Sequence, residues 1–275
     1  MLPSLIGVFL FFILPLFVVI YYSFIDNPIR AEFVGFDNFV NVWKNGAFKL
    51  AGKNTLIFSF IAMPLSVVLS LILAAMLDRN IPLRSQFRTF FLTPMMVPIA
   101  SVVLIVQVMF HYNGAINTLI QNLGGAKIDW LKSDYAGFVI VLLFLWKNLG
   151  YNMILFLAAL EAIPSSLIEV ALLENANRWQ IFWSIKIRYL SSTILFVTIL
   201  SLINSFKVFR EIYLMTGDYP YDSLYMLQHF MNNTFNSLDY QKLSTAAIIM
   251  SFVMIIIIGT LFLVESRFGR DVENE

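Results

Sequence analysis

Polar side chains that could bind a solute lie close together inside an apolar segment at 136–160. Lys147, Asn148, Tyr151 and Asn152 interrupt this segment, and the last three share one face if it is helical. In a membrane, an ionisable group at this depth costs about 2.5–3.5 kcal/mol and usually faces a cavity or a partner. Amides that donate and accept, beside an aromatic ring, suit a hydroxyl-rich ligand. The alternative is that these groups join helices of a bundle by hydrogen bonds.

A second polar cluster lies near the end of a later apolar segment at 191–213. It contains Asn204, Lys207, Arg210 and Glu211. Lys207 and Glu211 are four residues apart, which is the spacing of an ion pair along one helix. Arg210 lies near the end of the segment, from which its side chain can extend to the membrane surface. Asn204 and Lys207 lie deeper, and we expect these two to face a cavity.

The sequence contains no group of residues typical of an active site. It has no cysteine, and its two histidines, His111 and His229, fall in different predicted loops without carboxylates at metal-site spacing. The chain lacks the phosphate-binding sequence of P-loop ATPases, and the Gly124-Gly125 pair is a turn signal. We therefore expect no enzyme activity, metal or cofactor in this chain; if it takes part in ATP-driven transport, ATP and Mg²⁺ would be bound by partner subunits.

A polar stretch at 161–190, which we call the docking loop, separates the two apolar segments. Pro164 followed by two serines predicts a helix start, with Glu169 three residues after Ser166 in capping-box spacing. Small and apolar side chains then recur at helical spacing, at Ala171, Leu172, Ala176, Trp179 and Phe182. Such an element is either a helix resting on lipid headgroups, which the tryptophans suit, or a docking surface for a soluble partner.

The composition indicates an integral membrane protein. Hydrophobic residues make up 59% of the 275 residues and charged residues 13%, whereas a soluble domain carries about a quarter charged residues. The net charge of +1 gives no sign of nucleic-acid binding. We predict an all-α polytopic membrane protein that forms a single transmembrane domain over 1–275.

Six segments are long enough to cross a bilayer. They are predicted at about 2–24, 54–77, 89–110, 136–160, 191–213 and 243–264. Pro94 and Pro98 are expected to bend the third segment, and a charged tail at 265–275 ends the chain. The first segment lacks a basic start and a cleavage site, so we interpret it as a retained span. Six spans place both termini on the side of the docking loop, and the density of Lys and Arg favours the cytoplasm for that side, though weakly.

The residue order of the docking loop resembles that of a known family. Glu169-Val-Ala-Leu-Leu-Glu-Asn-Ala-Asn-Arg-Trp-Gln-Ile-Phe182 is similar to the cytoplasmic loop of permease subunits of ABC importers. Similarity to the sugar-type permeases extends to most of the chain, including Leu2 to Phe12, Asn54-Thr55-Leu56, Gly150 to Ala158, and Ser205 to Gly217.

The resemblance implies a permease of an ATP-driven importer in the bacterial cell membrane, with a carbohydrate as substrate. Its partners would be a second homologous permease, two ATP-binding cassette ATPases, an extracellular solute-binding protein and membrane lipid, without nucleic acid. In this family the docking loop forms a coupling helix in a cleft of the ATPase. The implied coupling residues are Glu169, Ala171, Glu174, Asn175, Ala176, Trp179, Gln180 and Phe182. The candidate substrate-pathway residues are Lys147, Asn148, Tyr151, Asn152, Asn204 and Lys207.

Two other functions stay open at this point. A phosphorylated or acidic solute would be attracted by Lys147, Lys207 and Arg210. A stand-alone secondary transporter is the third possibility, and the docking loop speaks against it.

The chain departs from the family pattern at several positions of the docking loop. Asn175 and Glu174 stand where the family has Gly and Asp, Val170 separates Glu169 from Ala171, and Arg188 stands where a Leu-Pro is usual. Asparagine is the commonest substitute for glycine at positive φ, so we expect a turn at Asn175. Without the proline, the helix is freer to continue through Arg188.

Overall fold

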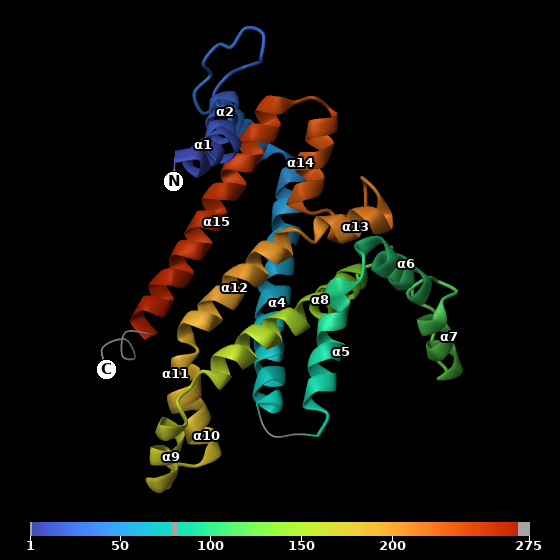
Figure 1. The fold of residues 1–275 in the computed structure, drawn as a ribbon. Coiled ribbons are helices and arrows are strands. Elements are labelled where there is room, and N and C mark those ends of the chain that lie inside the picture. Colours follow the sequence, from blue (N-terminus) through green and yellow to red (C-terminus); the bar gives the residue numbers. More distant parts are fainter. Residues whose placement is uncertain (1, 79–81, 269–275) are drawn as a thin grey trace. The chain divides into compact units, whose positions relative to one another are not determined.

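The computed structural model describes residues 2–78 and 82–268 (Figure 1). Residues 79–81, including Arg79 of the predicted basic loop, and 269–275 of the predicted charged tail lie outside the described residues. The described part is helical, which confirms the predicted all-α fold. Its elements are α1 Leu2–Val8, the π-helix η1 Phe9–Ile13, α2 Leu14–Ser23, α3 Asp37–Lys44, α4 Gly46–Leu77, α5 Arg84–Met96, α6 Ile99–Met109, α7 Ala115–Asn122, α8 Ala136–Glu161, α9 Ser165–Leu173, α10 Arg178–Ile181, the π-helix η2 Phe182–Lys186, α11 Ile187–Tyr189, α12 Ser191–Phe206, α13 Phe209–Thr216, the 3₁₀-helix η3 Asp222–Leu224, α14 Leu227–Asn236 and α15 Tyr240–Phe268.

In the part of the chain that the structure describes, five helical stretches are long and apolar enough to cross a membrane, and a sixth candidate is a bent pair. The second span begins at Gly46, earlier than the predicted residue 54. The sixth continues to Phe268, so residues 265–268 belong to a helix and not to a tail. Both helices are therefore longer than the apolar segments predicted from the sequence, because their polar end residues continue the helical hydrogen bonding.

The predicted third span consists of two helices, α5 and α6, bent by 96°. The break falls at Val97 and Pro98. Proline has no N–H to donate and restricts the preceding residue to extended geometry, and Val97 has φ −79° and ψ 130°. The expected bend is therefore confirmed at Pro98, whereas Pro94 lies inside α5 and does not end it.

The contacts of the chain form two compact units, residues 1–55 with 216–257, and residues 56–215 with 258–275. In the first unit, the side chain of Asn54 donates hydrogen bonds to the carbonyl oxygens of Asp222 (2.6 Å) and Tyr225 (3.1 Å). His229, predicted to lie in a loop, is buried in α14 and its Nδ1 accepts from the Met226 N–H. Burial lowers its pKa to about 4, so it stays neutral at physiological pH.

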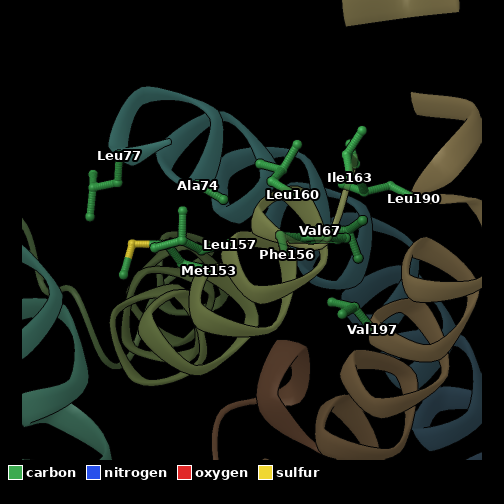
Figure 2. Close-up of a cluster of buried hydrophobic side chains, with 10 residues drawn as sticks. All are labelled: Val67, Ala74, Leu77, Met153, Phe156, Leu157, Leu160, Ile163, Leu190 and Val197. Carbon is green, nitrogen blue, oxygen red and sulfur yellow. The ribbon is translucent and has the colours of Figure 1, made fainter. Parts of the chain in front are cut away.

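The second unit contains a group of ten packed apolar side chains (Figure 2). It joins the later turns of α4, represented by Ala74 and Leu77, to Met153, Phe156 and Leu157 of α8. Lipid is as apolar as these side chains, so their association depends on close packing and on hydrogen bonds between helices.

Hydrogen bonds between small polar side chains run through the contact of α4, α8 and α12, and we call them the polar seam. The amide nitrogen of Asn152, which is fully buried, donates to the hydroxyls of Ser66 and Ser201, both at 2.9 Å. Ser59 and Ser205 share a hydrogen bond of 2.8 Å. The seam fixes the register of α8 against its two neighbours.

Helix α8 also approaches α5 very closely, at Gly150. A Cβ atom on Gly150 would overlap the backbone of Phe91. Glycine is therefore required here by the distance between two helices, since Gly150 lies inside a regular helix.

Gly150→Ala should lower the melting temperature in detergent, because overpacking of this kind costs about 1–3 kcal/mol. Gly137→Ala on the same helix is the control, since a Cβ there meets nothing within 4 Å and alanine is the better helix former by about 0.5–1 kcal/mol. Thermal denaturation should move in opposite directions for the two variants. Equal melting temperatures would contradict the close approach of α5 and α8.

Candidate functional site

A cavity of about 270 Å³ opens among α5, α8, α12 and α13, and we call it the central cavity. Every predicted substrate-pathway residue except Asn152 lines it. These are Lys147, Asn148, Tyr151, Asn204 and Lys207, joined by Arg210 and Glu211. The structure thus brings the two polar clusters of the sequence together at one place in the second unit.

The central cavity lies beside two breaks in spanning helices. Helix α12 ends at Phe206 and α13 begins at Phe209, so Lys207 stands at a break in the fifth span. Met95, which also lines the cavity, precedes the 96° bend between α5 and α6. Irregular backbone at membrane depth is tolerated where it lines a cavity, and discontinuous helices often mark the solute site of transporters.

An ion pair crosses the central cavity. The Nζ atom of Lys147 lies 2.5 Å from Oε1 of Glu211, whose side chain is 9% exposed. The spacing-based pairing of Lys207 with Glu211 is therefore wrong. The break after Phe206 takes these two residues out of a common helical register, and Glu211 reaches across to α8 instead.

Several polar groups of the central cavity lack a hydrogen-bond or ion-pair partner among the described residues. The other carboxylate oxygen of Glu211, Oε2, is buried and accepts no hydrogen bond from the residues that the structure describes. Within residues 2–78 and 82–268, neither Lys207 nor Arg210 forms an ion pair with a carboxylate. The cavity thus offers one open acceptor and two cationic donors to a solute.

The amides of the cavity wall are held in place by hydrogen bonds. Asn204 donates to Oδ1 of Asn148 (3.0 Å), and Asn148 donates to the Phe144 carbonyl (2.8 Å). Asn152 is different, because both of its donated bonds belong to the polar seam. The structure therefore gives Asn152 a helix-packing contact and places it outside the cavity wall, although it shares a helix with Asn148 and Tyr151.

The docking loop has the turn that the sequence predicts at Asn175. Asn175 has φ +61°, its N–H bonds the Leu172 carbonyl (3.1 Å), and the Ala176 N–H bonds the Ala171 carbonyl (2.9 Å). This is a Schellman arrangement, in which a left-handed residue closes a helix C-terminus. Asn175 thus adopts the left-handed conformation that glycine usually supplies at a helix C-terminus.

The helices on either side of this turn begin differently from the prediction. Helix α9 starts at Ser165 with Pro164 as N-cap and no side-chain cap, so the capping box expected at Ser166 does not form. The capping box lies at α10, where Asn177 and Gln180 each bond the other's backbone N–H, at 2.9 and 2.8 Å. Ser166 falls inside the first turn of α9, two positions after the N-cap residue Pro164, so it does not cap the helix.

The docking loop presents apolar and acidic groups to its surroundings. Leu173 is 83% and Trp179 71% exposed, and Glu169 is exposed on the same helix as Leu173. Trp179 packs against Phe182 and Trp183, with ring centroids 6.5 and 5.7 Å away. Grouped exposed apolar side chains mark interaction surfaces.

As expected without the proline, the helix continues through Arg188 in α11.

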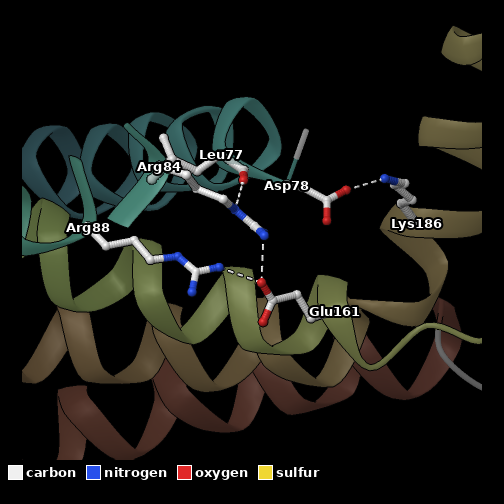
Figure 3. A network of polar contacts seen from close by, with 6 residues as sticks. All are labelled: Leu77, Asp78, Arg84, Arg88, Glu161 and Lys186. Carbon is white, nitrogen blue, oxygen red and sulfur yellow. Dashed lines mark hydrogen bonds and ion pairs between the residues drawn. The ribbon is translucent and has the colours of Figure 1, made fainter. Parts of the chain in front are cut away.

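Ion pairs that sequence reasoning missed tie both ends of the docking loop to the membrane helices (Figure 3). Glu161, at the end of α8, pairs with Arg84 (2.7 Å) and Arg88 of α5. Lys186 of η2 pairs with Asp78, directly after α4, at 2.5 Å. The available signals were the acidic residues Asp78 and Glu161 at the ends of two spans, and basic residues at 84–88 and at 186. The loop is therefore tied to α5, to α8 and to the end of α4.

Comparisons with known proteins agree with this architecture. Residues 66–273 match the family described as binding-protein-dependent transport system inner membrane component. The trehalose/maltose transport system permease protein MalF of Thermococcus litoralis is 30% identical over 98% of this chain and 93% of its own. The lactose transport system permease protein LacF of Rhizobium radiobacter is 32% identical over 87% of this chain and 82% of its own.

A solved structure shares the fold. It is the bacterial alginate ABC transporter in complex with alginate pentasaccharide-bound periplasmic protein, one chain of which superposes with a TM-score of 0.84. The two chains are 21% identical, and the match covers 98% of this chain and 93% of the other.

Spanning helices, a cavity beside broken spans and a structured loop define a membrane transport protein. The chain belongs to the family of binding-protein-dependent transport system inner membrane components. Its relatives are transport permeases and not enzymes, which agrees with the absence of catalytic motifs from the sequence.

Lys147→Met should lower stability by about 1–3 kcal/mol, because it leaves the carboxylate of Glu211 buried without its cation. The double variant Lys147→Met/Glu211→Gln removes the charge and should recover most of the loss. Lys207→Met is the matched control, from the same cavity but without a carboxylate partner in the described part of the chain. Thermal denaturation of the four proteins tests the pair, and a double variant no better than Lys147→Met would contradict it.

Proposed function

We propose that this chain is the permease subunit of an ATP-driven importer, and that it carries a carbohydrate across the cytoplasmic membrane. The central cavity carries this proposal. Asn148 and Asn204 supply amides, Tyr151 a partly exposed ring, and Glu211 an open carboxylate oxygen. Hydroxyl-rich solutes need such paired donors and acceptors beside an apolar face.

The docking loop would couple the cavity to ATP hydrolysis on another subunit. Glu169 and Ala171 would contact the ATPase, with Glu174, Asn175 and Ala176 forming the turn and Trp179, Gln180 and Phe182 packing behind. The loop follows α8 directly and is tied through Glu161 to α5. Closure of the ATPases would therefore move the two helices that carry Met95 and Lys147, and so change access to the cavity.

The remaining partners follow from the same assignment. A second homologous permease would complete the pathway, two ATPases would bind ATP and Mg²⁺, and an extracellular binding protein would deliver the solute. The periplasmic protein bound to the alginate transporter supports the last of these. We place both termini in the cytoplasm and treat 1–275 as one permease domain, with the bent α5–α6 pair as one span.

A second candidate is an acidic or phosphorylated solute. Lys207 and Arg210 favour it, since neither has a carboxylate partner among the described residues although both line the cavity. The Lys147–Glu211 pair weakens it, because one of the three cations is already neutralised.

Glu169→Lys should abolish co-purification of the ATPase while the level of the chain in membranes stays normal. The reversed charge would meet a surface complementary to a carboxylate, and such like-charge contacts cost several kcal/mol. Glu32→Lys, an exposed glutamate between the first two spans, is the control and should retain the ATPase. Normal retention of the ATPase by Glu169→Lys would refute the coupling role.

The double variant Lys207→Gln/Arg210→Gln shows which of the two candidate solutes the chain carries. Uptake is measured in liposomes that contain the importer, its binding protein and ATP. Uptake of a neutral sugar should change by less than about threefold, whereas an anion would lose about tenfold or more with its charged partners. Asn204→Ala should reduce uptake of either solute. Tight binding of an anion and of no sugar by the binding protein would overturn the carbohydrate assignment, and uptake without the ATPases would favour a stand-alone transporter.

A further inference from the structure

A second cavity, of about 450 Å³, opens where the docking loop enters α12 and where α15 ends. The side chains that line it change from charged to aliphatic along the helices. Arg188 precedes the start of α12 and Arg267 lies in the last turn of α15, whereas Leu195 and Leu261 lie one to two turns further inside their spans. With 1.5 Å of rise per residue, about 9 Å separates Leu261 from Arg267 along the helix axis. One end of the cavity is therefore cationic and the other aliphatic.

Among the residues that the structure describes, no carboxylate forms an ion pair at the cationic end. In the described ranges, neither Arg188 nor Arg267 pairs with a carboxylate. Glu265 also lines the cavity, and its Oε1 accepts a hydrogen bond from Ser192 at 3.1 Å. Two arginines against one glutamate leave a net charge of +1. Trp183 at the same end is 51% exposed, and tryptophan favours the interface between headgroups and acyl chains.

We propose that this cavity binds a phospholipid with an anionic headgroup. The lipid phosphate and acidic headgroup would lie between Arg188 and Arg267, and one acyl chain would lie along Leu195 and Leu261. A zwitterionic lipid would leave the net positive charge uncompensated. An acidic protein segment would leave the aliphatic end unfilled. The site goes beyond the proposed import of solute, because it shares no residue with the central cavity or with the contacts expected for the ATPase.

The geometry predicts a graded loss of lipid selectivity. A basic side chain near an anionic surface contributes about fivefold in affinity. Arg188→Gln and Arg267→Gln should each lower the preference for anionic lipid about fivefold, and the double variant should lose most of it. Leu195→Trp should lower the binding of any lipid at this site, because it fills the aliphatic end without changing charge.

The test uses the intact importer complex, purified with this chain and placed in nanodiscs of mixed phosphatidylglycerol and phosphatidylethanolamine. Native mass spectrometry then gives the ratio of the two lipids that remain bound. Arg178→Gln is the matched control, an exposed arginine of the docking loop that does not line the cavity. It should keep the ratio of the unaltered complex.

The outcomes separate the site from general surface charge. Loss of phosphatidylglycerol in the two arginine variants, but not in Arg178→Gln, supports the proposal. Equal loss in all three variants, or no loss in the double variant, overturns it. Absence of bound phosphatidylglycerol from the unaltered complex also overturns it, because the cavity would then hold no anionic lipid. Leu195→Trp provides an independent answer if the arginine variants fail to assemble.

Discussion

The buried amide of Asn152 joins three membrane helices, α4, α8 and α12. In a hydrocarbon medium, helices gain no hydrophobic free energy by meeting one another, so α4, α8 and α12 need specific contacts. Asn152 supplies them through Ser66 and Ser201, and Gly150 lets α5 approach the same helix. Helix α8 is thus fixed on two sides, and its remaining polar groups are presented to the central cavity.

The breaks in α5–α6 and α12–α13 are the second constraint. They interrupt the helical hydrogen bonding at membrane depth, which is tolerated because the backbone there lines a cavity. The break also moves Glu211 from its expected partner Lys207 to Lys147. The irregular backbone therefore lines the central cavity and also determines which charged side chains of its wall form the ion pair.

The docking loop is fastened to the membrane helices at both ends. Its ends are tied to the membrane helices by Glu161 and Lys186, and its middle is a pair of short helices joined by the turn at Asn175. The side chains between these anchors are exposed. The loop therefore combines a direct connection to α8 with an exposed outer surface, which are the two features on which the proposed coupling to an ATPase rests.

Local properties of the sequence determined the helical membrane fold, the approximate spans, the turn at Asn175 and the bend at Pro98, because apolar length and backbone preference act over neighbouring residues. Pairings between distant residues were decided by the tertiary structure. Spacing along one helix assigned Glu211 to Lys207 and grouped Asn152 with Asn148, whereas the fold pairs Glu211 with Lys147 and turns Asn152 into the polar seam. The ion pairs of Glu161 and Lys186 join residues more than seventy positions apart. A single sequence contains the charges of such pairs but not the helix packing that brings them within a few ångströms.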